Sequence, residues 1–256
     1  MSNFEKQYKT ILKNCLAKGI ERNDRTGIGS YSLFNQTLKI NISKKFPIIT
    51  GRKIYKKIFD TEFDWFINGE TNIKRFQDAN VTIWNEWADS NGNLGPVYGY
   101  QMLNFNNENI NQLENLINSL KLNKDSRRHI ISLWNPIQLN KMALPPCYLY
   151  FQFYVDKNSN VNMFVVQRSG DLFLGIPYDI ALFSKILLYI ASETNLKANK
   201  LEVQIVDAHI YKNQIESIQE YLAQTIYKLP KYEYNNKNLQ LINYKSGPKI
   251  TAKVAV

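Results

Sequence analysis

The chain has 256 residues, of which 44% are hydrophobic, and it carries a formal net charge of +10. This length fits one large domain or two small ones, and the apolar content is enough for a sizeable core. The longest apolar stretch, 180–191, is interrupted by Ser184 and Lys185, so we expect no membrane span. The first residues lack the apolar segment of a signal peptide, and two cysteines far apart make no disulfide framework. A reducing, cytoplasmic setting is therefore expected.

The positive charge is spread along the chain rather than concentrated. Lysines form only short pairs, such as Lys44-Lys45 and Lys56-Lys57, and no long basic run or basic helical stripe is present. The charge therefore favours anionic ligands in general and makes nucleic acid an unlikely partner. A basic, catalytically silent nucleic-acid-binding protein remains the alternative from a different functional class.

Apolar periodicity predicts helices and strands that alternate along the chain. In chain order, the expected elements are a helix over 4–17, a strand over 31–42, helices over 53–67 and 109–121, strands over 129–134, 148–155 and 161–168, a helix over 178–193, a strand over 201–207, a helix over 212–226 and a strand over 238–243. The segment 80–105 has no clean period, which is typical of a functional segment. No repeat or linker interrupts the chain. The simplest interpretation is one α+β domain over residues 1–256, with a mixed sheet packed against helices.

One cysteine stands in a setting suited to nucleophilic chemistry. Pro145-Pro146-Cys147 is rigid, and Arg168, 21 residues later, could keep the sulfur ionised. A thiolate attacks carbon well, whereas a thiol attacks poorly. Taken alone, a free cysteine is more often a small buried hydrophobe, so this pattern needs support from the rest of the chain.

That support comes from a series of short motifs in a fixed order. They are 22–27 (RNDRTG), 46–50 (FPIIT), 65–73 (WFINGETNI), 83–89 (IWNEWAD), 94–99 (LGPVYG), 126–128 (SRR), 143–147 (ALPPC), 151–155 (FQFYV), 167–169 (QRS), 173–177 (FLGIP) and 207–211 (DAHIY). With these motifs, from about residue 20 to the C-terminus, the chain resembles the thymidylate synthase family. The resemblance implies a thymidylate synthase-like mixed sheet and a homodimer that forms through that sheet.

The resemblance also implies the chemistry. Cys147 would add to C6 of a pyrimidine nucleotide, so that C5 becomes nucleophilic and takes a one-carbon unit from the co-substrate 5,10-methylenetetrahydrofolate. Glu62 matches the general acid or base that acts through water near position 4 of the base. Tyr98 matches the residue that assists removal of the C5 proton. No metal is implied.

Binding roles follow from the same matched positions. Arg25, Arg168 and Ser169 match residues that hold the nucleotide phosphate, and Gln167 belongs to the same motif. Arg127 and Arg128 match the pair that reaches the phosphate of the other subunit, which implies an obligate homodimer. His209 and Tyr211 match the pair that binds the sugar 3′-hydroxyl. Without the family match, ordinary salt bridges, a core histidine and a packed tyrosine would explain these residues as well.

The resemblance further implies a folate pocket. A pterin needs apolar walls and a carboxylate that can bind its nitrogens. The residues at the matching positions are Ile83, Trp84, Trp87, Asp171, Leu174, Gly175, Tyr178 and Ala255. Asp171 is also expected on the nucleotide side, and the tryptophans by composition alone could be core residues.

Two departures from the family pattern concern position 4 of the base. Asp179 stands where thymidylate synthases have Asn, and Tyr148 follows the cysteine where they have His. A protonated carboxylic acid offers O–H to cytosine N3 and accepts from its 4-amino group. An ionised Asp179 would repel O4 of uracil. These departures favour deoxycytidylate (dCMP) over deoxyuridylate (dUMP), although drift in an unusual thymidylate synthase would also produce them.

The fate of the transferred carbon depends on whether water or hydride reaches it. Trp84 and the terminal Ala255 and Val256, which close the site in the family, favour a methyl product. The dCMP-specific relatives of the family are mostly hydroxymethylases, which favours a hydroxymethyl product. We therefore expect dCMP hydroxymethylation, with dCMP methylation or thymidylate synthesis from dUMP as alternatives. Such enzymes are typical of phages, which would place this one in the host cytoplasm.

Overall fold

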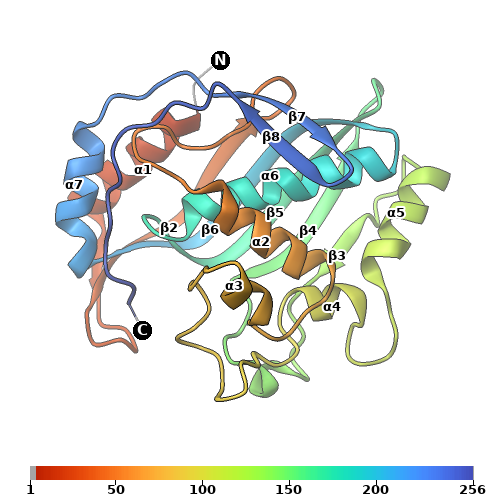
Figure 1. Ribbon diagram of the computed structural model, residues 1–256, viewed down its shortest axis with the longest axis horizontal. Helices are drawn as coiled ribbons and strands as arrows, with labels where there is room; N and C mark the ends of the chain where they lie inside the picture. The colour runs from red at the N-terminus through yellow and green to blue at the C-terminus, as the bar shows by residue number, and fades with distance from the viewer. Residues whose placement is uncertain (1–3, 256) are drawn as a thin grey trace.

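The computed structural model describes residues 4–255 and is built on a six-stranded mixed sheet (Figure 1). The strands are β1 (Ile20–Arg22), β2 (Ser30–Asn41), β3 (Ile130–Ser132), β4 (Tyr148–Val155), β5 (Asn160–Asp171) and β6 (Lys197–Tyr211). Their spatial order is β1-β2-β6-β5-β4-β3, and only the β5–β6 pair is parallel. A separate hairpin consists of β7 (Lys231–Asn235) and β8 (Asn238–Ile242). The predicted α+β fold with a mixed sheet is confirmed.

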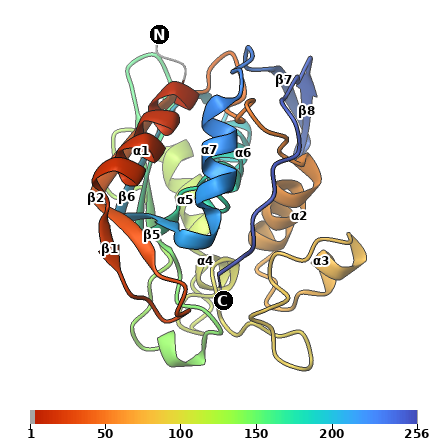
Figure 2. The ribbon, with the colours of Figure 1, turned by 90° about the vertical axis from the view of Figure 1, so that its left-hand side faces the viewer.

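Helices cover one face of this sheet in two layers (Figure 2). Helices α1 (Phe4–Lys18) and α6 (Ile176–Glu193) contact the strands, α2 (Lys56–Ile67) packs on α6, and α7 (Ile215–Ala223) packs on α1. The shorter elements are α3 (Lys74–Asp78), α4 (Gly99–Leu103), α5 (Gln112–Leu122), and the 3₁₀ turns η1 (Leu139–Lys141) and η2 (Lys212–Gln214). No helix within 4–255 has both the length and the apolar character that crossing a bilayer requires.

Helix α6 is the central helix because its sequence is apolar on every side. Pro177 lies in its first turn, where a missing N–H costs nothing. Its two interior polar side chains are paired: the Ser184 hydroxyl donates to the carbonyl of Ile180 at 2.7 Å, and Lys185 Nζ lies 2.7 Å from Asp60 Oδ1 on α2. The helix can therefore be buried between the sheet and α2 without leaving these polar groups unsatisfied.

The structure differs from the predicted elements mainly where distant segments meet. Helix α2 begins at Lys56 rather than at residue 53, because the chain before it pairs with the C-terminal segment: the amide of Lys53 donates to the carbonyl of Pro248 at 2.9 Å. The expected helix 212–226 is a 3₁₀ turn followed by α7, and the irregular segment 80–105 contains α4. Periodicity missed α3, β1 and β7, which are short. It also ended β5 and β6 too early.

The longer β5 and β6 decide where the site forms. Because they are parallel, their carboxyl ends meet at the same edge of the sheet, with Ser169 opposite Asp207 and Asp171 opposite His209. Strand β4 is antiparallel to β5 and begins at this edge. The C-terminal segment ends between α7 and α3 in both ribbon views (Figures 1 and 2).

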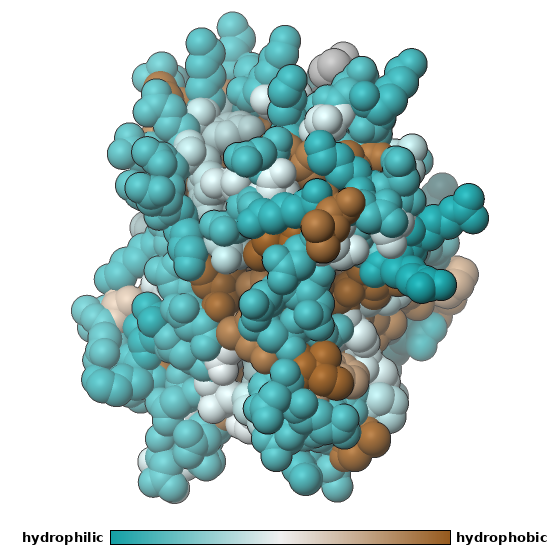
Figure 3. Space-filling view, turned by 90° about the vertical axis from the view of Figure 1, so that its right-hand side faces the viewer, coloured by the Kyte–Doolittle hydropathy of each residue, from teal (hydrophilic) through white to brown (hydrophobic). Residues whose placement is uncertain are grey.

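The side of the molecule that carries α5 is mainly hydrophilic, with hydrophobic residues visible in its middle (Figure 3). Leu122, which ends α5, and Ile130 on β3 are among the exposed large apolar residues. The core lies instead between the sheet and its helices, where Phe59, Phe63 and Phe183 are fully buried.

Candidate active site

A cavity of about 350 Å³ opens where the carboxyl ends of β5 and β6 meet the start of β4 and helices α2 and α6. It brings together all but two of the expected site residues: Arg25, Glu62, Ile83, Trp84, Trp87, Tyr98, Cys147, Gln167, Arg168, Ser169, Asp171, Leu174, Gly175, Tyr178, Asp179, His209, Tyr211 and Ala255. Val256, expected to help close the site, lies outside the described residues. Residues more than two hundred positions apart thus share one small volume.

Arg168 holds the loop that carries the candidate nucleophile. Its Nε donates to the carbonyl of Pro146 at 2.9 Å and its Nη2 to the carbonyl of Pro145 at 2.8 Å. Its backbone amide donates to the carbonyl of Cys147 at 2.9 Å. The guanidinium also lies over the ring of Trp134, 5.7 Å from the ring centre. The arginine therefore positions the cysteine loop in addition to placing positive charge beside it.

The thiol of Cys147 has a raised pKa in this structure. Desolvation is the largest cause and Asp179 adds to it, while Arg168, a hydrogen bond from Tyr98 and Arg25 oppose it. Arg168 acts in the expected direction, because its charge lowers the pKa of the thiol, but the net shift is upward. The arginine lowers the cost of forming the thiolate but does not outweigh desolvation.

Tyr98 connects the cysteine to the aromatic wall of the cavity. Its hydroxyl accepts a hydrogen bond of 3.1 Å from the amide of Cys147, and its ring packs against Phe66 and Trp84. Its backbone has φ +26°, a conformation that costs energy for any residue with a side chain. Such strain persists only where surrounding packing compensates for it, and here it places the hydroxyl beside the cysteine.

Glu62 is a buried carboxyl group on the inner side of α2. The only hydrogen bond that its side chain makes within the described residues is with Trp84, whose Nε1 donates to Oε1 at 3.3 Å. Desolvation, followed by the charge of Asp179, raises its pKa to about 8, and the bond from Trp84 opposes this shift. At neutral pH Glu62 is therefore largely protonated, which is the state required of a general acid.

Asp179 projects from the first turn of α6 into the cavity. Tyr148 donates from its hydroxyl to Oδ1 at 2.9 Å, and Gln167 donates from Nε2 to Oδ2 at 2.8 Å. Desolvation raises the pKa of Asp179 to about 7, against the lowering effect of these two bonds, and Asp171 adds to the rise. The carboxyl group can therefore gain or lose a proton near neutral pH.

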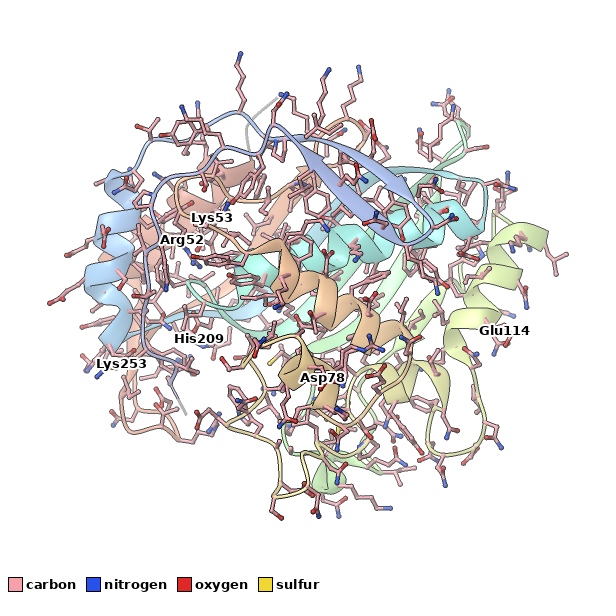
Figure 4. All side chains as sticks on the ribbon, viewed as in Figure 1. Arg52, Lys53, Asp78, Glu114, His209 and Lys253 are labelled. Atoms are coloured by element: carbon pink, nitrogen blue, oxygen red, sulfur yellow. The ribbon has the colours of Figure 1, made fainter. Side chains whose placement is uncertain are left out.

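The residues expected to bind the phosphate and the sugar also line the cavity. Arg25 comes from the loop before β2, Ser169 from β5, and His209 and Tyr211 from β6. Desolvation opposes a charge on His209, but its hydrogen bond to Asp207 and the charge of Asp171 raise its pKa overall. Figure 4 shows His209 in the region between Arg52 and Lys253, far from Glu114 on α5.

The residues expected to form the folate pocket lie together in the lining of the cavity, and two of them are tryptophans. Trp84 is buried and packs at 5.8 Å from Trp87, and a side chain on Gly175 would lie 3.2 Å from the carbonyl of Asp171. Asp171 Oδ1 already accepts from the amides of Phe173 and Leu174, and Oδ2 accepts from Gln214 at 2.8 Å. Only the remaining acceptor capacity of Oδ2 is free to bind a ligand N–H.

Arg127 and Arg128 are not in this cavity. Both are exposed, and Arg127 lines a separate groove beside β4 and β5. One copy of the chain therefore does not bring them to the cavity that holds the other expected site residues. Their expected role in the site of a second subunit is compatible with this position.

Several residues that shape the site were not among the expected ones. Ile58 and Leu144 line the cavity, and only the position of Leu144 just before the Pro-Pro-Cys motif hinted at this. Arg52 is buried and donates from Nη2 to the carbonyl of Phe173 at 2.6 Å. Gln214 holds Asp171. Neither of these supporting contacts has a signal in the sequence, since each joins segments far apart in the chain.

The cavity places a cysteine, two carboxyl groups with raised pKa values and an aromatic wall at one sheet edge, an arrangement that fits folate-dependent transfer of a one-carbon unit to C5 of a pyrimidine nucleotide. The thymidylate synthase family model matches residues 6–256, and the chain belongs to that family. Its members use methylenetetrahydrofolate as co-substrate and are typically dimers. Within 4–255, no three His, Cys, Asp or Glu residues are grouped so as to hold a metal ion.

Proposed function

We propose that the protein hydroxymethylates dCMP at C5, with 5,10-methylenetetrahydrofolate as the one-carbon donor and water as the second reactant. The observation that carries this proposal is the carboxyl group of Asp179. It stands beside Cys147 in the cavity, has a pKa of about 7, and is clamped at both oxygens.

The base preference follows from hydrogen-bond complementarity. Cytosine presents an acceptor at N3 and a donor at its 4-amino group, and a protonated Asp179 supplies the matching donor and acceptor. An ionised Asp179 facing N3-protonated cytosine makes the same two bonds. Either way the pair needs one proton, and a pKa of about 7 keeps that proton available at neutral pH. Uracil facing an ionised Asp179 would instead place O4 against a negative oxygen, which disfavours dUMP.

The residues of this chain prepare and control the reaction. The Cys147 sulfur forms a bond to C6 as its proton leaves, and Arg168 stabilises the sulfur anion. Glu62 holds a proton for the polar group at position 4 of the base, so that charge developing there is neutralised. Tyr98 lies beside the cysteine, where it assists removal of the C5 proton. When bound, the folate would supply the methylene group that C5 attacks. After loss of the C5 proton, tetrahydrofolate would leave, water would add to the exocyclic methylene, and the bond between the Cys147 sulfur and C6 would break to release the product.

A second candidate is methylation of the same nucleotide. Trp84 forms part of the buried cavity wall, and Ala255 at the end of the described chain lines the cavity and is 6% exposed. Both positions favour exclusion of water, which would leave hydride transfer as the faster route. Hydroxymethylation remains the proposal because the carboxylate at position 179 groups this chain with the dCMP-specific members of its family, and those members are mostly hydroxymethylases.

We also propose that the active form is a homodimer through the uncovered face of the sheet. Two large aromatic side chains on the sheet strands are exposed, Phe34 on β2 at 80% and Tyr154 on β4 at 69%. A second subunit packed on the sheet would remove such side chains from water. The arrangement would allow Arg127 and Arg128 of one subunit to reach the phosphate bound by the other.

The proposed function is tested with purified protein, methylenetetrahydrofolate and either dCMP or dUMP. We expect turnover of dCMP to a product heavier by CH2O, because a hydroxymethyl group replaces the C5 hydrogen, with no rise in dihydrofolate absorbance. A methyl product accompanied by dihydrofolate would replace the proposal with the second candidate. Turnover of dUMP alone would refute the base preference.

The variant Asp179→Asn isolates the residue that reads the base. Because an amide donates to O4 and accepts from N3–H of uracil, the ratio of kcat/KM for dCMP over dUMP should fall by about 100-fold, the worth of two mismatched hydrogen bonds. Asp78→Asn is the matched control, since Asp78 is exposed on α3 and outside the cavity. An unchanged ratio in Asp179→Asn would mean that the base is read elsewhere.

A further inference from the structure

We infer that Tyr148 is a positioning residue for base recognition: its hydroxyl holds the carboxyl group of Asp179 in the orientation that pairs with cytosine in both protonation states. This inference rests on the proposed function, because it concerns how that same site selects its nucleotide. It makes the base preference a property of the Tyr148–Asp179 pair rather than of Asp179 alone.

The Tyr148 side chain has one available position. It is 5% exposed, its ring lies 4.9 Å from that of Tyr98, and it meets the ring of Phe183 edge-on at 4.8 Å. Phe151 packs against it at 6.3 Å. A ring enclosed in this way cannot turn aside without opening a cavity. The hydroxyl is therefore held beside Asp179 Oδ1, at 2.9 Å.

Gln167 restrains the other oxygen of the same carboxyl group. Its Nε2 donates to Oδ2 at 2.8 Å, and Tyr148 and Gln167 are register partners on β4 and β5. The two donors thus come from facing positions of one strand pair and fix the plane of the carboxyl group. An ionised carboxylate has about four acceptor directions, so each oxygen keeps acceptor capacity for the base.

Both donors can keep their bonds when Asp179 gains a proton. Each oxygen of a carboxylic acid still has a lone pair, so Tyr148 and Gln167 can go on donating to Asp179 while the acid O–H donates to N3 of cytosine. A proton on Asp179 therefore does not release the carboxyl group from these two bonds.

The other ionisable groups around Asp179 do not replace these donors. Glu62 faces it from α2, Tyr98 from the start of α4, Cys147 from the beginning of β4 and Asp171 from the end of β5. All four are neutral or negative, so none of them stabilises an ionised Asp179. The hydrogen bonds from Gln167 and Tyr148 are the contacts that favour the ionised form.

Tyr148→Phe tests the inference. The measurement is kcat/KM for dCMP and for dUMP between about pH 5.5 and about pH 9.5, a range that extends to both sides of the pKa of Asp179. Wild-type kcat/KM for dCMP should decline as pH rises through the pKa of Asp179, because recognition of cytosine needs the shared proton. Loss of the Tyr148 donor should move that decline about half to one pH unit higher and lower kcat/KM for dCMP about tenfold. In an Asp179→Asn background, Tyr148→Phe should no longer change the base ratio.

Two controls keep the test decisive. Tyr150→Phe removes a hydroxyl from the same strand but outside the cavity, and it should leave the pH profile unchanged. If Tyr148→Phe does not fold, 3-fluorotyrosine at position 148 nearly preserves the shape and strengthens the donor while the buried phenol stays protonated through the decline, and it should move the decline to lower pH.

The outcomes distinguish this inference from the proposed function. If the wild type turns over dCMP but neither change at position 148 moves the pH profile or the base ratio, Tyr148 has no positioning role and the inference is overturned. If the wild type turns over only dUMP, the proposed function and the inference fail together.

Discussion

Asp179 and Glu62 lower the free energy of unfolding at neutral pH, and in return the site has two carboxyl groups that can hold a proton. Each carboxyl group is removed from water, and desolvation raises the pKa of Asp179 to about 7 and that of Glu62 to about 8. Their folded-state pKa values therefore lie above those of unfolded carboxyl groups, near 4. Folding binds protons at these positions, so the free energy of unfolding should decrease as pH rises from about 4 to about 8.

This linkage predicts that neutral replacements stabilise the protein at alkaline pH. Asp179→Asn and Glu62→Gln should each raise the free energy of unfolding at pH 8 by on the order of 2 kcal/mol. At this pH the unfolded carboxyl groups are ionised and folding must protonate or desolvate them, whereas an amide carries no charge in either state. At pH 4 the gain should largely disappear. Urea unfolding at both pH values measures the difference, with Asp78→Asn as the exposed control. An equal effect at pH 4 and pH 8 would mean that these carboxyl groups are not protonated on folding.

At the scale of elements, the contact between α2 and α4 places Tyr98. Gly99, the first residue of α4, packs so closely on α2 that an added Cβ would lie 2.2 Å from the carbonyl of Phe66. A backbone atom cannot move aside as a flexible side chain can. The close approach of these two helices therefore depends on glycine at this position.

Gly99→Ala should separate the two helices and displace Tyr98 from Cys147. We expect a loss of about 2–3 kcal/mol in the free energy of unfolding from overpacking, together with a fall in kcat. Gly27→Ala is the comparison, because a side chain there would meet no atom within 4 Å and only its φ of +71° opposes alanine; its cost should be about 1 kcal/mol. Equal losses in the two variants would contradict the proposed contact.

At the scale of the whole molecule, Arg127 and Arg128 connect activity to assembly. Both side chains are exposed, and neither lines the cavity of its own chain. If they complete the phosphate site of a second copy, neither a Cys147→Ser homodimer nor an Arg127→Ala/Arg128→Ala homodimer has a complete site. A mixed dimer has one, because an intact cysteine in one subunit faces intact arginines in the other.

Subunit mixing tests this arrangement. Co-expression of the two variants with different tags, followed by isolation of mixed dimers, should restore about half of the wild-type turnover per dimer. The parent homodimers serve as controls and should have little activity. Full activity in the arginine double variant, or none in the mixed dimer, would exclude a shared site.

The order of the main elements could be predicted from periodicity because helices and strands repeat their side chains locally. Helix α6 is the clearest example, with an apolar run and Pro177 in its first turn. The end of β6 could not be predicted in this way. Its residues beyond 207 pair with β2 and β5 on either side, and those partners are distant in sequence.

The residues of the candidate site could be predicted from the sequence, because the residue types in the motifs indicate the chemistry that each side chain can perform. Cys147, Glu62 and Asp179 could be named from their motifs, and the structure places all three at one cavity. Their protonation could not be predicted. A neighbouring arginine suggested an ionised Cys147, yet desolvation outweighs it.

The sequence by itself determined the longer helices and strands, which family the motifs resemble and which side chains could react, because periodicity and residue type are properties of the chain. Only the tertiary structure decided that Tyr148 and Gln167 clamp opposite oxygens of Asp179, that desolvation raises the pKa of Cys147, and that Arg127 lies outside the cavity. The physical reason is that hydrogen-bond geometry and desolvation depend on distances through space, and those distances exist only once segments far apart in the chain have packed together.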